Sequence, residues 1–198
     1  MRKGEQTRQE IIRKAAPIFN QRGYDGAALS DLMKATGLKK GGIYRHFSSK
    51  QALAAEAFDY AWRETLDARI HDLDTIPNTV DRLKQLVVNF VERRGIIPGG
   101  CPLLNTAVDT DDGNSVLRER ARKALQVWRS YLILMIRAGI KAREIHPKID
   151  AKKLATLIIS FLEGAIMVYR LDGTEEALRA VQAHLGSYLE TEVRARSK

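Results

Sequence analysis

Residues 39–50 read KKGGIYRHFSSK, a stretch that is basic at both ends and aromatic in its second half. Its two adjacent glycines fall where the first turn of a short helix is expected. A glycine costs roughly 1 kcal/mol relative to alanine in a helix, so contact with an outside partner explains the pair better than folding does. The alternative is that Gly41-Gly42 form a loop and that the helix is merely short.

The side chains of this helix divide into two faces when they are placed at about 100° per residue. Ile43 and Phe47 then point inward, towards a core that contains Leu29, Leu32 and Phe19. The opposite face is centred on Gly41, Gly42 and Arg45, with Lys40, Tyr44 and His46 at its sides. With so little bulk at its leading end, this face can approach a DNA major groove while Arg45 reaches a base edge.

The residues before this stretch predict a helix-turn-helix. Residues 28–36 form a short helix that ends at Thr36-Gly37, and Gly37 takes the left-handed conformation at the turn. The next helix covers residues 40–47. Many helical hairpins share this spacing, so the turn alone is a weak indication of DNA binding.

Helical periodicity continues through the rest of the chain, and no segment alternates like a strand. We therefore predict an all-α fold of nine helices, with Ser48 or Ser49 capping the fourth. The predicted helices cover residues 5–22, 28–36, 40–47, 50–72, 79–94, 103–110, 115–143, 150–170 and 174–194. Residues 1–50 are expected to form the DNA-binding domain, and residues 51–198 a domain for ligand binding and dimerisation.

The positive charge is concentrated at one end of the sequence. The net charge is +9 over 198 residues; residues 1–50 hold eleven Lys/Arg and four Asp/Glu, and residues 51–198 hold twenty-two and twenty. This distribution favours a small polyanion-binding module joined to a nearly neutral body. A solvated basic face would give the same counts.

Three features favour a reducing cytoplasm. The first twenty residues lack the apolar core of a signal peptide. The apolar run Leu154–Tyr169 is interrupted by Glu163 and is expected to be too short to cross a bilayer. The single cysteine, Cys101, cannot form an internal disulfide.

The first fifty residues resemble the DNA-binding domain of the TetR (tetracycline-repressor-like) family of bacterial transcription regulators. The matching residues are Arg8 to Gly23-Tyr24, Leu29-Ser30-Asp31-Leu32, Thr36-Gly37-Leu38, Gly42-Ile43-Tyr44-Arg45-His46-Phe47 and Ser49-Lys50. The resemblance implies that Tyr44, His46 and Lys50 contact phosphates. It also implies that Lys39, Lys40, Gly41 and Arg45 touch bases or nearby phosphates, and that Ser30 faces the duplex.

The chain departs from the family at the start of the second helix. The family usually has Ser or Thr as the cap, whereas this chain has Ala27-Ala28. Gly26 or Asp25 must then cap the helix, or its start is looser. A small residue is also usual where Met33 stands.

A helix-turn-helix protein usually binds DNA as a dimer, with recognition helices about 34 Å apart on a palindromic operator. Apolar positions on the last two predicted helices fit the four-helix dimer interface of the family. The expected interface residues are Leu157, Phe161, Gly164, Ala165, Val168, Val181 and Leu185. The alternative is that these residues form an ordinary internal core.

The resemblance also implies an effector domain, whose sequence varies within the family. An apolar cavity for a small hydrophobic molecule is expected among its helices. The expected lining residues are Phe90, Trp128, Tyr131, Leu132, Met135 and Phe161. An aromatic stripe of this kind is also typical of plain core.

Residues 99–105, GGCPLLN, resemble a segment found in a subset of the family. If Pro102 is the first helical residue, Cys101 is the N-cap, where the helix dipole lowers the pKa of a thiol. We expect the flanking glycines to leave Cys101 accessible to an electrophilic effector. A small buried side chain is the alternative.

These observations predict a homodimeric, ligand-responsive repressor whose partners are double-stranded DNA, a second copy of itself and a small hydrophobic or electrophilic effector, with no membrane. An enzyme is disfavoured, because the sequence contains no phosphate loop, no HExxH and no catalytic constellation. We therefore expect no catalytic residue, cofactor or metal. A protein-binding relative without operator recognition is disfavoured by the basic segment at residues 39–50.

Overall fold

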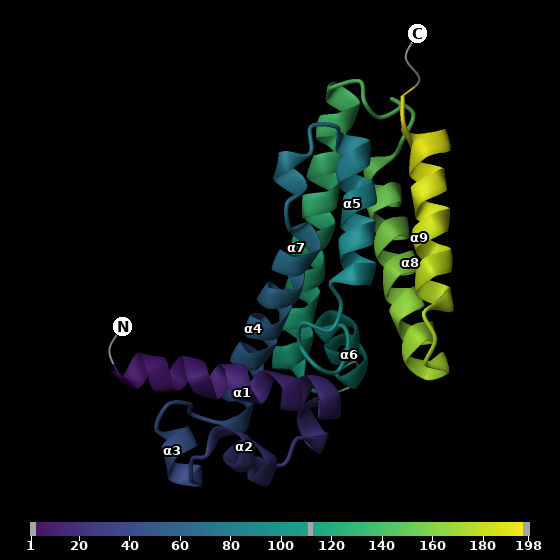
Figure 1. The fold of residues 1–198 in the computed structure, drawn as a ribbon. Coiled ribbons are helices and arrows are strands. Elements are labelled where there is room, and N and C mark those ends of the chain that lie inside the picture. Colours follow the sequence, from purple (N-terminus) through teal and green to yellow (C-terminus); the bar gives the residue numbers. More distant parts are fainter. Residues whose placement is uncertain (1–2, 111–112, 196–198) are drawn as a thin grey trace. The chain divides into compact units, whose positions relative to one another are not determined.

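A computed structural model of the chain describes residues 3–110 and 113–195, and within these residues it contains nine α-helices (Figure 1). They are α1 (Lys3–Gly26), α2 (Leu29–Thr36), α3 (Lys40–Tyr44), α4 (Lys50–Ile70), α5 (Thr79–Glu92), α6 (Pro102–Asp109), α7 (Ser115–Lys141), α8 (Ala151–Asp172) and α9 (Glu176–Tyr188). A 3-10 turn (Leu73–Thr75) precedes α5, and a π-helical turn, η2 (Leu189–Val193), follows α9. The all-α prediction is therefore confirmed.

The chain packs into two compact units, each built from separate stretches of sequence. The first unit consists of Met1–Thr65 and Gly95–Ala124, and the second of Leu66–Arg94 and Leu125–Lys198. The predicted boundary at residue 50 divides the chain by function, into a DNA-binding part and a part for ligand binding and dimerisation. This division stays a prediction. Packing alone divides the chain differently, because residues 95–124 belong with the N-terminal helices.

The core of the first unit is formed by α1 to α4. Ile43 and Phe47 are buried there against Leu32, as the helical periodicity predicts. Gly37 ends α2 in the left-handed conformation, with φ of 72°, and its N–H donates to the carbonyl of Met33. Ser49 Oγ accepts from the N–H of Ala52 at 3.0 Å, so Ser49 caps α4.

A polar clasp joins α1 to the segment before and within α6. Asn105 Nδ2 donates to the carbonyl of Asn20 at 3.0 Å and to that of Gly99 at 2.8 Å. Asn20 Nδ2 in turn donates to the carbonyl of Pro98 at 3.0 Å, and the N–H of Tyr24 donates to Asp109 Oδ2 at 2.8 Å. These bonds satisfy the carbonyls of Pro98 and Gly99 before α6 and the N–H of Tyr24, and they hold residues 98–109 against α1.

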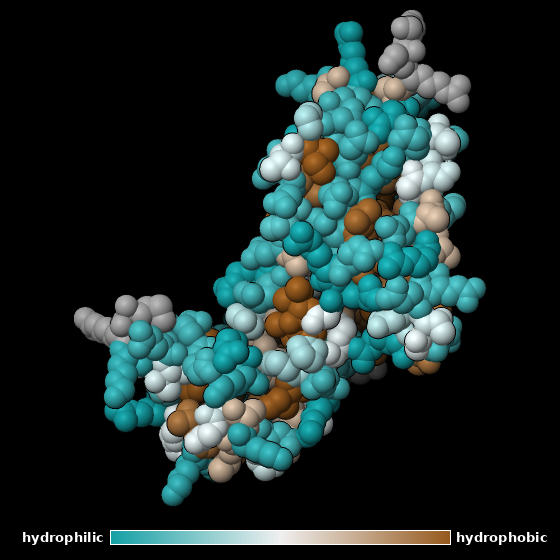
Figure 2. Space-filling model, in the orientation of Figure 1, coloured by the Kyte–Doolittle hydropathy of each residue, from teal (hydrophilic) through white to brown (hydrophobic). Residues whose placement is uncertain are grey.

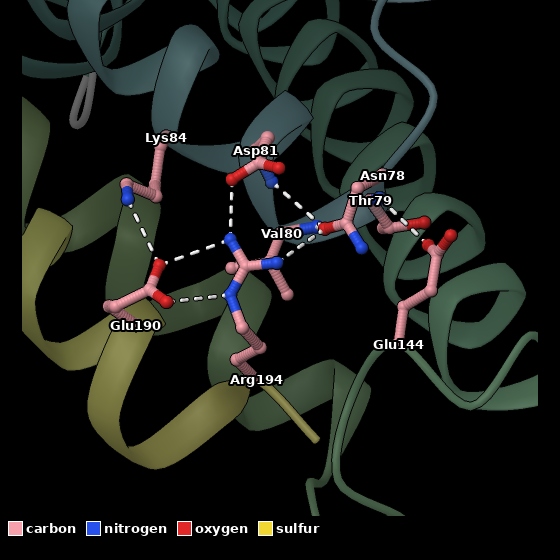
Figure 3. A network of polar contacts seen from close by, with 8 residues as sticks. All are labelled: Asn78, Thr79, Val80, Asp81, Lys84, Glu144, Glu190 and Arg194. Carbon is pink, nitrogen blue, oxygen red and sulfur yellow. Dashed lines mark hydrogen bonds and ion pairs between the residues drawn. The ribbon is translucent and has the colours of Figure 1, made fainter. Parts of the chain in front are cut away.

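The second unit is closed at one end by its C-terminal segment. Arg194 Nη1 donates to Asn78 Oδ1 at 3.1 Å, and Arg194 also pairs with Asp81 and Glu190 (Figure 3). The N–H of His146 donates to the carbonyl of Val193 at 2.8 Å. The end of η2 is thus tied to the start of α5 and to the loop after α7.

Four details differ from the predicted elements. α1 runs to Gly26 across a non-helical Gly23, whose φ is 71°. α3 ends at Tyr44; beyond it the N–H of His46 donates to the carbonyl of Ile43, three residues earlier, which makes a tighter turn than an α-helix. The last predicted helix, 174–194, is shortened to α9 and continues as η2. Ala28 is the N-cap of α2 and makes no side-chain cap bond, so the looser start applies rather than a cap by Asp25 or Gly26.

α8 is long and apolar enough to cross a membrane by length and composition alone. The expectation that residues 154–169 are too short is therefore wrong, because the helix around them has 22 residues. In this fold, several apolar residues of α8 pack inside the protein. Leu154, Ile158 and Leu162 are buried in the second unit, and most of the surface visible in Figure 2 is hydrophilic.

Candidate nucleic-acid interface

The structure gives α3 one buried side and one exposed side. Ile43 and Phe47 are 1% and 3% exposed, whereas Arg45 is exposed. A β-carbon built at Gly41 would meet nothing within 4 Å, so the glycine is not required by packing inside the chain. A β-carbon at Gly42 would only touch Leu38 at ordinary contact distance. The bare leading edge expected from the sequence is present.

The other predicted DNA-binding residues surround this edge at the surface. Lys39 and Lys40 are exposed at the start of α3, and Ser30 is exposed in the first turn of α2. Tyr44 and His46 are half-buried at the end of α3. All of them belong to the first unit, close in sequence to the helix-turn-helix that carries them.

Lys50 has a defined position at the start of α4. Its ammonium group lies 4.5 Å from the centroid of the Tyr24 ring, and the Tyr24 ring stacks on Phe19 at 6.5 Å. A cation–π contact of this kind restricts a long, flexible side chain. Lys50 is thus held half-buried near the end of α1 instead of moving freely in solvent.

This unit supplies a helix-turn-helix with cationic side chains, an exposed guanidinium and little steric bulk in front of it. Such a surface can bind duplex phosphates and read base edges in the major groove. Among the residues that the structure describes, no group of three His, Cys, Asp or Glu side chains could hold a metal ion.

The name α8/α9 face is used for the predicted interface residues that are exposed or half-exposed on these two helices, which are Leu157, Phe161, Gly164, Val168 and Val181. The Phe161 ring lies 5.5 Å from His184, which stacks on Tyr188 at 6.5 Å. Ala165 and Leu185 are buried in the core of the protomer, 4% and 1% exposed. Each lies one helical turn after a surface residue of this face, Phe161 or Val181, but its side chain is covered within one protomer, and its place in an interface stays a prediction.

The predicted cavity residues are only partly brought together. Phe90 and Trp128 stack with their ring centroids 6.2 Å apart, and both are buried in the second unit. Tyr131 and Met135 are half-buried on α7. Burial raises the pKa of Tyr131 above its ordinary value of 10.0, so the phenol stays neutral. Phe161 is 40% exposed on the α8/α9 face, and its assignment to the cavity is therefore wrong.

Cys101 is the N-cap of α6 and is followed by Pro102, as predicted. The expectation that it is accessible is wrong, because its side chain is only 2% exposed. Gly99 and Gly100 have φ values of 113° and 94° and turn the chain so that the thiol faces inward. Cys101 belongs to the first unit, whereas Phe90 and Trp128 belong to the second.

The sequence analysis missed a buried ion pair in the second unit. Arg69 Nη2 of α4 lies 3.3 Å from Glu163 Oε1 of α8, and the guanidinium lies over the rings of Phe90 and Trp128. The signal was present in the sequence, because Glu163 is the one carboxylate within an apolar run. The sequence spacing does not identify its partner, because Arg69 lies ninety-four positions earlier in the chain.

The fold and the exposed basic surface together define an all-α, helix-turn-helix DNA-binding protein. Residues 11–57 match the family described as "Bacterial regulatory proteins, tetR family", and residues 79–185 match "Tetracyclin repressor-like, C-terminal domain". The chain belongs to the TetR family of transcription regulators. Members of this family are not enzymes; they bind DNA operators, dimerise through the C-terminal domain and bind small-molecule effectors.

Solved structures support this membership over the whole chain. A TetR transcriptional regulator from Chloroflexus aurantiacus J-10-FL is 43% identical, with a TM-score of 0.94 over 99% of this chain and 100% of that one. A TetR-family regulator from Cytophaga hutchinsonii is 32% identical, with a TM-score of 0.93 over 100% and 99%. The HTH-type transcriptional repressor DhaR of Mycobacterium sp. (strain GP1) is 25% identical over 86% of each chain.

Proposed function

We propose that the protein is a homodimeric repressor, located in the cytoplasm, that leaves a palindromic operator when an effector binds to its second unit. The single observation that carries the DNA-binding part is the exposed Arg45 beside the bare edge at Gly41, on a helix whose other side is buried. Repression is supported by the family, in which regulators are often repressors.

Arg45 reads a base edge, whereas the surrounding residues bind phosphates and set the position of the protein on the duplex. The phosphate contacts are assigned to Tyr44, His46 and Lys50. Bases or nearby phosphates are contacted by Lys39, Lys40 and Gly41, and Ser30 faces the duplex. The division predicts two kinds of mutational effect. Arg45→Ala should cost about 1–3 kcal/mol at one or two operator positions and relax specificity there. Lys50→Ala should weaken binding to all sequences alike and reduce the salt dependence by about one unit of slope.

Fluorescence anisotropy on an operator selected from random DNA, at several salt concentrations, measures both effects. Lys123→Ala is a matched control for Lys50→Ala, since Lys123 is an exposed lysine of the same unit that is not among the predicted DNA-binding residues. Identical profiles for Arg45→Ala and Lys50→Ala would show that the division between base reading and phosphate binding is wrong.

The glycine at the leading edge gives a sharper test. Gly41→Ala adds a methyl group into open space, so the fold should gain up to about 1 kcal/mol from helix propensity. Operator affinity should nevertheless fall, because the methyl group separates the α3 backbone from the duplex. Gly186→Ala on α9 is the control, since its β-carbon also meets nothing within 4 Å. Unchanged operator affinity in Gly41→Ala would exclude close approach of the backbone.

The α8/α9 face is proposed to pair with the same face of a second copy. Phe161→Asp should give a monomer in analytical ultracentrifugation and should lose operator binding, because a single recognition helix makes too few contacts. Met167→Asp is the matched control, because Met167 is exposed on α8 but lies outside the α8/α9 face. A dimeric Phe161→Asp protein would place the interface elsewhere.

The effector is proposed to bind among Phe90, Trp128, Tyr131 and Met135. An electrophile that modifies Cys101 is the second candidate, and its support is the position of the thiol at the N-terminus of α6. Cys101→Ser separates the two: it should abolish release by thiol-reactive compounds and leave release by other effectors intact. Retained release by an electrophile would exclude Cys101 as the sensor.

A further inference from the structure

A buried charge pair occupies the centre of the second unit. The Arg69 and Glu163 side chains are 5% and 12% exposed, and Arg69 Nη2 lies 3.3 Å from Glu163 Oε1. Removing two charges from water costs several kcal/mol per ion, and apolar residues of similar volume often give an equally stable core. Stability alone therefore does not explain why these two residues stand here.

Two aromatic rings complete the surroundings of the Arg69 guanidinium. Its central carbon lies 4.3 Å from the centroid of the Phe90 ring and 4.4 Å from that of Trp128. Both rings are buried and almost parallel, with an interplanar angle of 7°. Two π faces and one carboxylate are the groups with which proteins recognise organic cations. We call Phe90, Trp128 and Glu163 the cation box.

The backbone beside Arg69 is also held in place. The side chain of Asn89, buried on α5, donates from Nδ2 to the carbonyl of Arg69 at 3.2 Å and to that of His71 at 2.9 Å. Arg69 stands in the last turn of α4, which begins at Lys50. The occupant of the cation box is therefore a side chain at the end of the helix that starts beside the DNA-binding residues.

We propose that the effector is an organic cation that replaces the Arg69 guanidinium in the cation box. The inference rests on the proposed function, because it names the class of effector for the same domain. Arg69 acts as an internal substitute for the effector while the repressor is on DNA. When the Arg69 side chain leaves, the space that its three methylene groups and planar guanidinium had filled becomes free. This space suits a small ligand with an apolar part and a cationic head.

Charge balance favours a cation over an anion. When a cation replaces the guanidinium, Glu163 and both rings keep a positive partner, and the displaced Arg69 has a long side chain able to reach solvent. An anion paired with Arg69 would instead leave the Glu163 carboxylate buried beside a second negative charge, which is costly. A neutral ligand would leave Glu163 without a positive partner.

The exchange gives the effector unequal affinities for two states of the protein. It binds only where Arg69 has left the box, and this preference can shift the equilibrium between the states. The last turn of α4 then loses the side-chain contacts of Arg69 with α5, α7 and α8. The change therefore begins at one end of α4, whose other end carries Lys50.

Benzamidinium, benzamide and benzoate test the inference, because they share a ring and a planar head group and differ in charge. Isothermal titration calorimetry on the full chain without DNA should detect binding of benzamidinium, with benzamide and benzoate at least tenfold weaker. Glu163→Gln should weaken benzamidinium at least tenfold. Arg69→Met, which removes the internal competitor, should tighten it at least tenfold.

Matched controls come from an exposed ion pair of the same unit. Arg179 pairs with Glu92 at the surface, so Arg179→Met and Glu92→Gln should leave benzamidinium affinity unchanged. Arg69→Met leaves Glu163 without this partner and can fail to fold. The double variant Arg69→Met/Glu163→Gln removes both charges; it should fold and bind benzamidinium no better than benzamide.

The inference is overturned if benzoate binds more tightly than benzamidinium, or if neither the wild type nor Arg69→Met binds benzamidinium at millimolar concentration. It is also overturned if Glu163→Gln binds benzamidinium as well as the wild type does. Operator release by benzamidinium is measured separately by anisotropy. A protein that binds its selected operator but no cation contradicts only this inference, whereas a protein that selects no operator contradicts the proposed function.

Discussion

Helices α2 and α3 of the DNA-binding surface begin differently from α5 and α8 of the second unit. Within the described part of the chain, no side chain caps α2 or α3, whose N-caps are Ala28 and Lys39. In contrast, Asn78 Oδ1 accepts from two N–H groups of α5, and Asp150 Oδ1 does the same for α8. The starts of α5 and α8 are thus satisfied within the second unit, whereas α9 of the same unit begins at Glu175 without a side-chain cap. The starts of α2 and α3 leave their N–H groups to water or to an anionic partner.

The largest expected effect concerns the stability of the core beneath the DNA-binding helices. Phe47 is buried below the Arg8 guanidinium, which lies 4.8 Å from its ring centroid. Phe47→Ala should lower the free energy of unfolding by about 3–5 kcal/mol, because it leaves a cavity. Urea denaturation followed by circular dichroism measures this change. Val127→Ala at an exposed site of α7 should change stability by no more than about 0.5 kcal/mol.

The next effect concerns the clasp between α1 and α6. Gly99 has φ of 113°, and a β-carbon there would lie 2.8 Å from the carbonyl oxygen of Asn20. Gly99→Ala should cost about 1–3 kcal/mol from backbone strain, and the clash adds to this loss. Gly95→Ala is the matched control, since Gly95 has φ of 79° but open space, and about 1–2 kcal/mol is expected there. Equal losses would show that the contact with Asn20 contributes nothing.

A pair of cap substitutions tests the opening comparison directly. Ala28→Ser supplies the missing acceptor at α2 and should raise stability by about 0.5–2 kcal/mol, whereas Asp150→Ala should lower it by a similar amount. Thermal unfolding monitored by circular dichroism reports both. If Ala28→Ser gave no gain, the start of α2 would already be satisfied, and the contrast between the two regions would fail.

The smallest effect is the pH dependence of the second unit. Arg194, and then Lys84, donate to Glu190 and lower its pKa below the ordinary value of 4.5. A lowered folded-state pKa contributes stability above the unfolded value, which is lost as the pH falls from about 4.5 through the lower folded-state value. Glu190→Gln should therefore flatten the stability profile in this range. Arg194→Met should flatten it as well, and a slope unchanged in both variants would contradict the assignment.

Local sequence determines much of this molecule. The left-handed turn at Gly37 follows from backbone sterics, and the burial of Ile43 and Phe47 follows from helical periodicity. The same reasoning placed the exposed Phe161 in the cavity, and it did not show that Ala165 and Leu185 are buried within the protomer. On an apolar helix with several neighbours, periodicity cannot tell which apolar side faces the core of the protomer.

Contacts between distant segments could not be predicted in the same way. The bond between Asn20 and Asn105 spans 85 positions, and the burial of Cys101 depends on the turn made by Gly99 and Gly100. The pairing of Arg69 with Glu163 has the same origin. The sequence signal for this pair is a carboxylate within an apolar run. This signal indicates a buried partner but does not identify the residue.

The clasp at Asn20 bears on any attempt to exchange operator specificity between regulators. A chimaera cut at residue 50 would separate α1 from Asn105 and Asp109, and would leave the hydrogen-bonding groups of Asn20 and the Tyr24 N–H facing a foreign sequence. Transplantation should succeed only when residues 95–124 travel with the N-terminal helices. The unit to exchange in a chimaera is therefore a discontinuous block of the sequence.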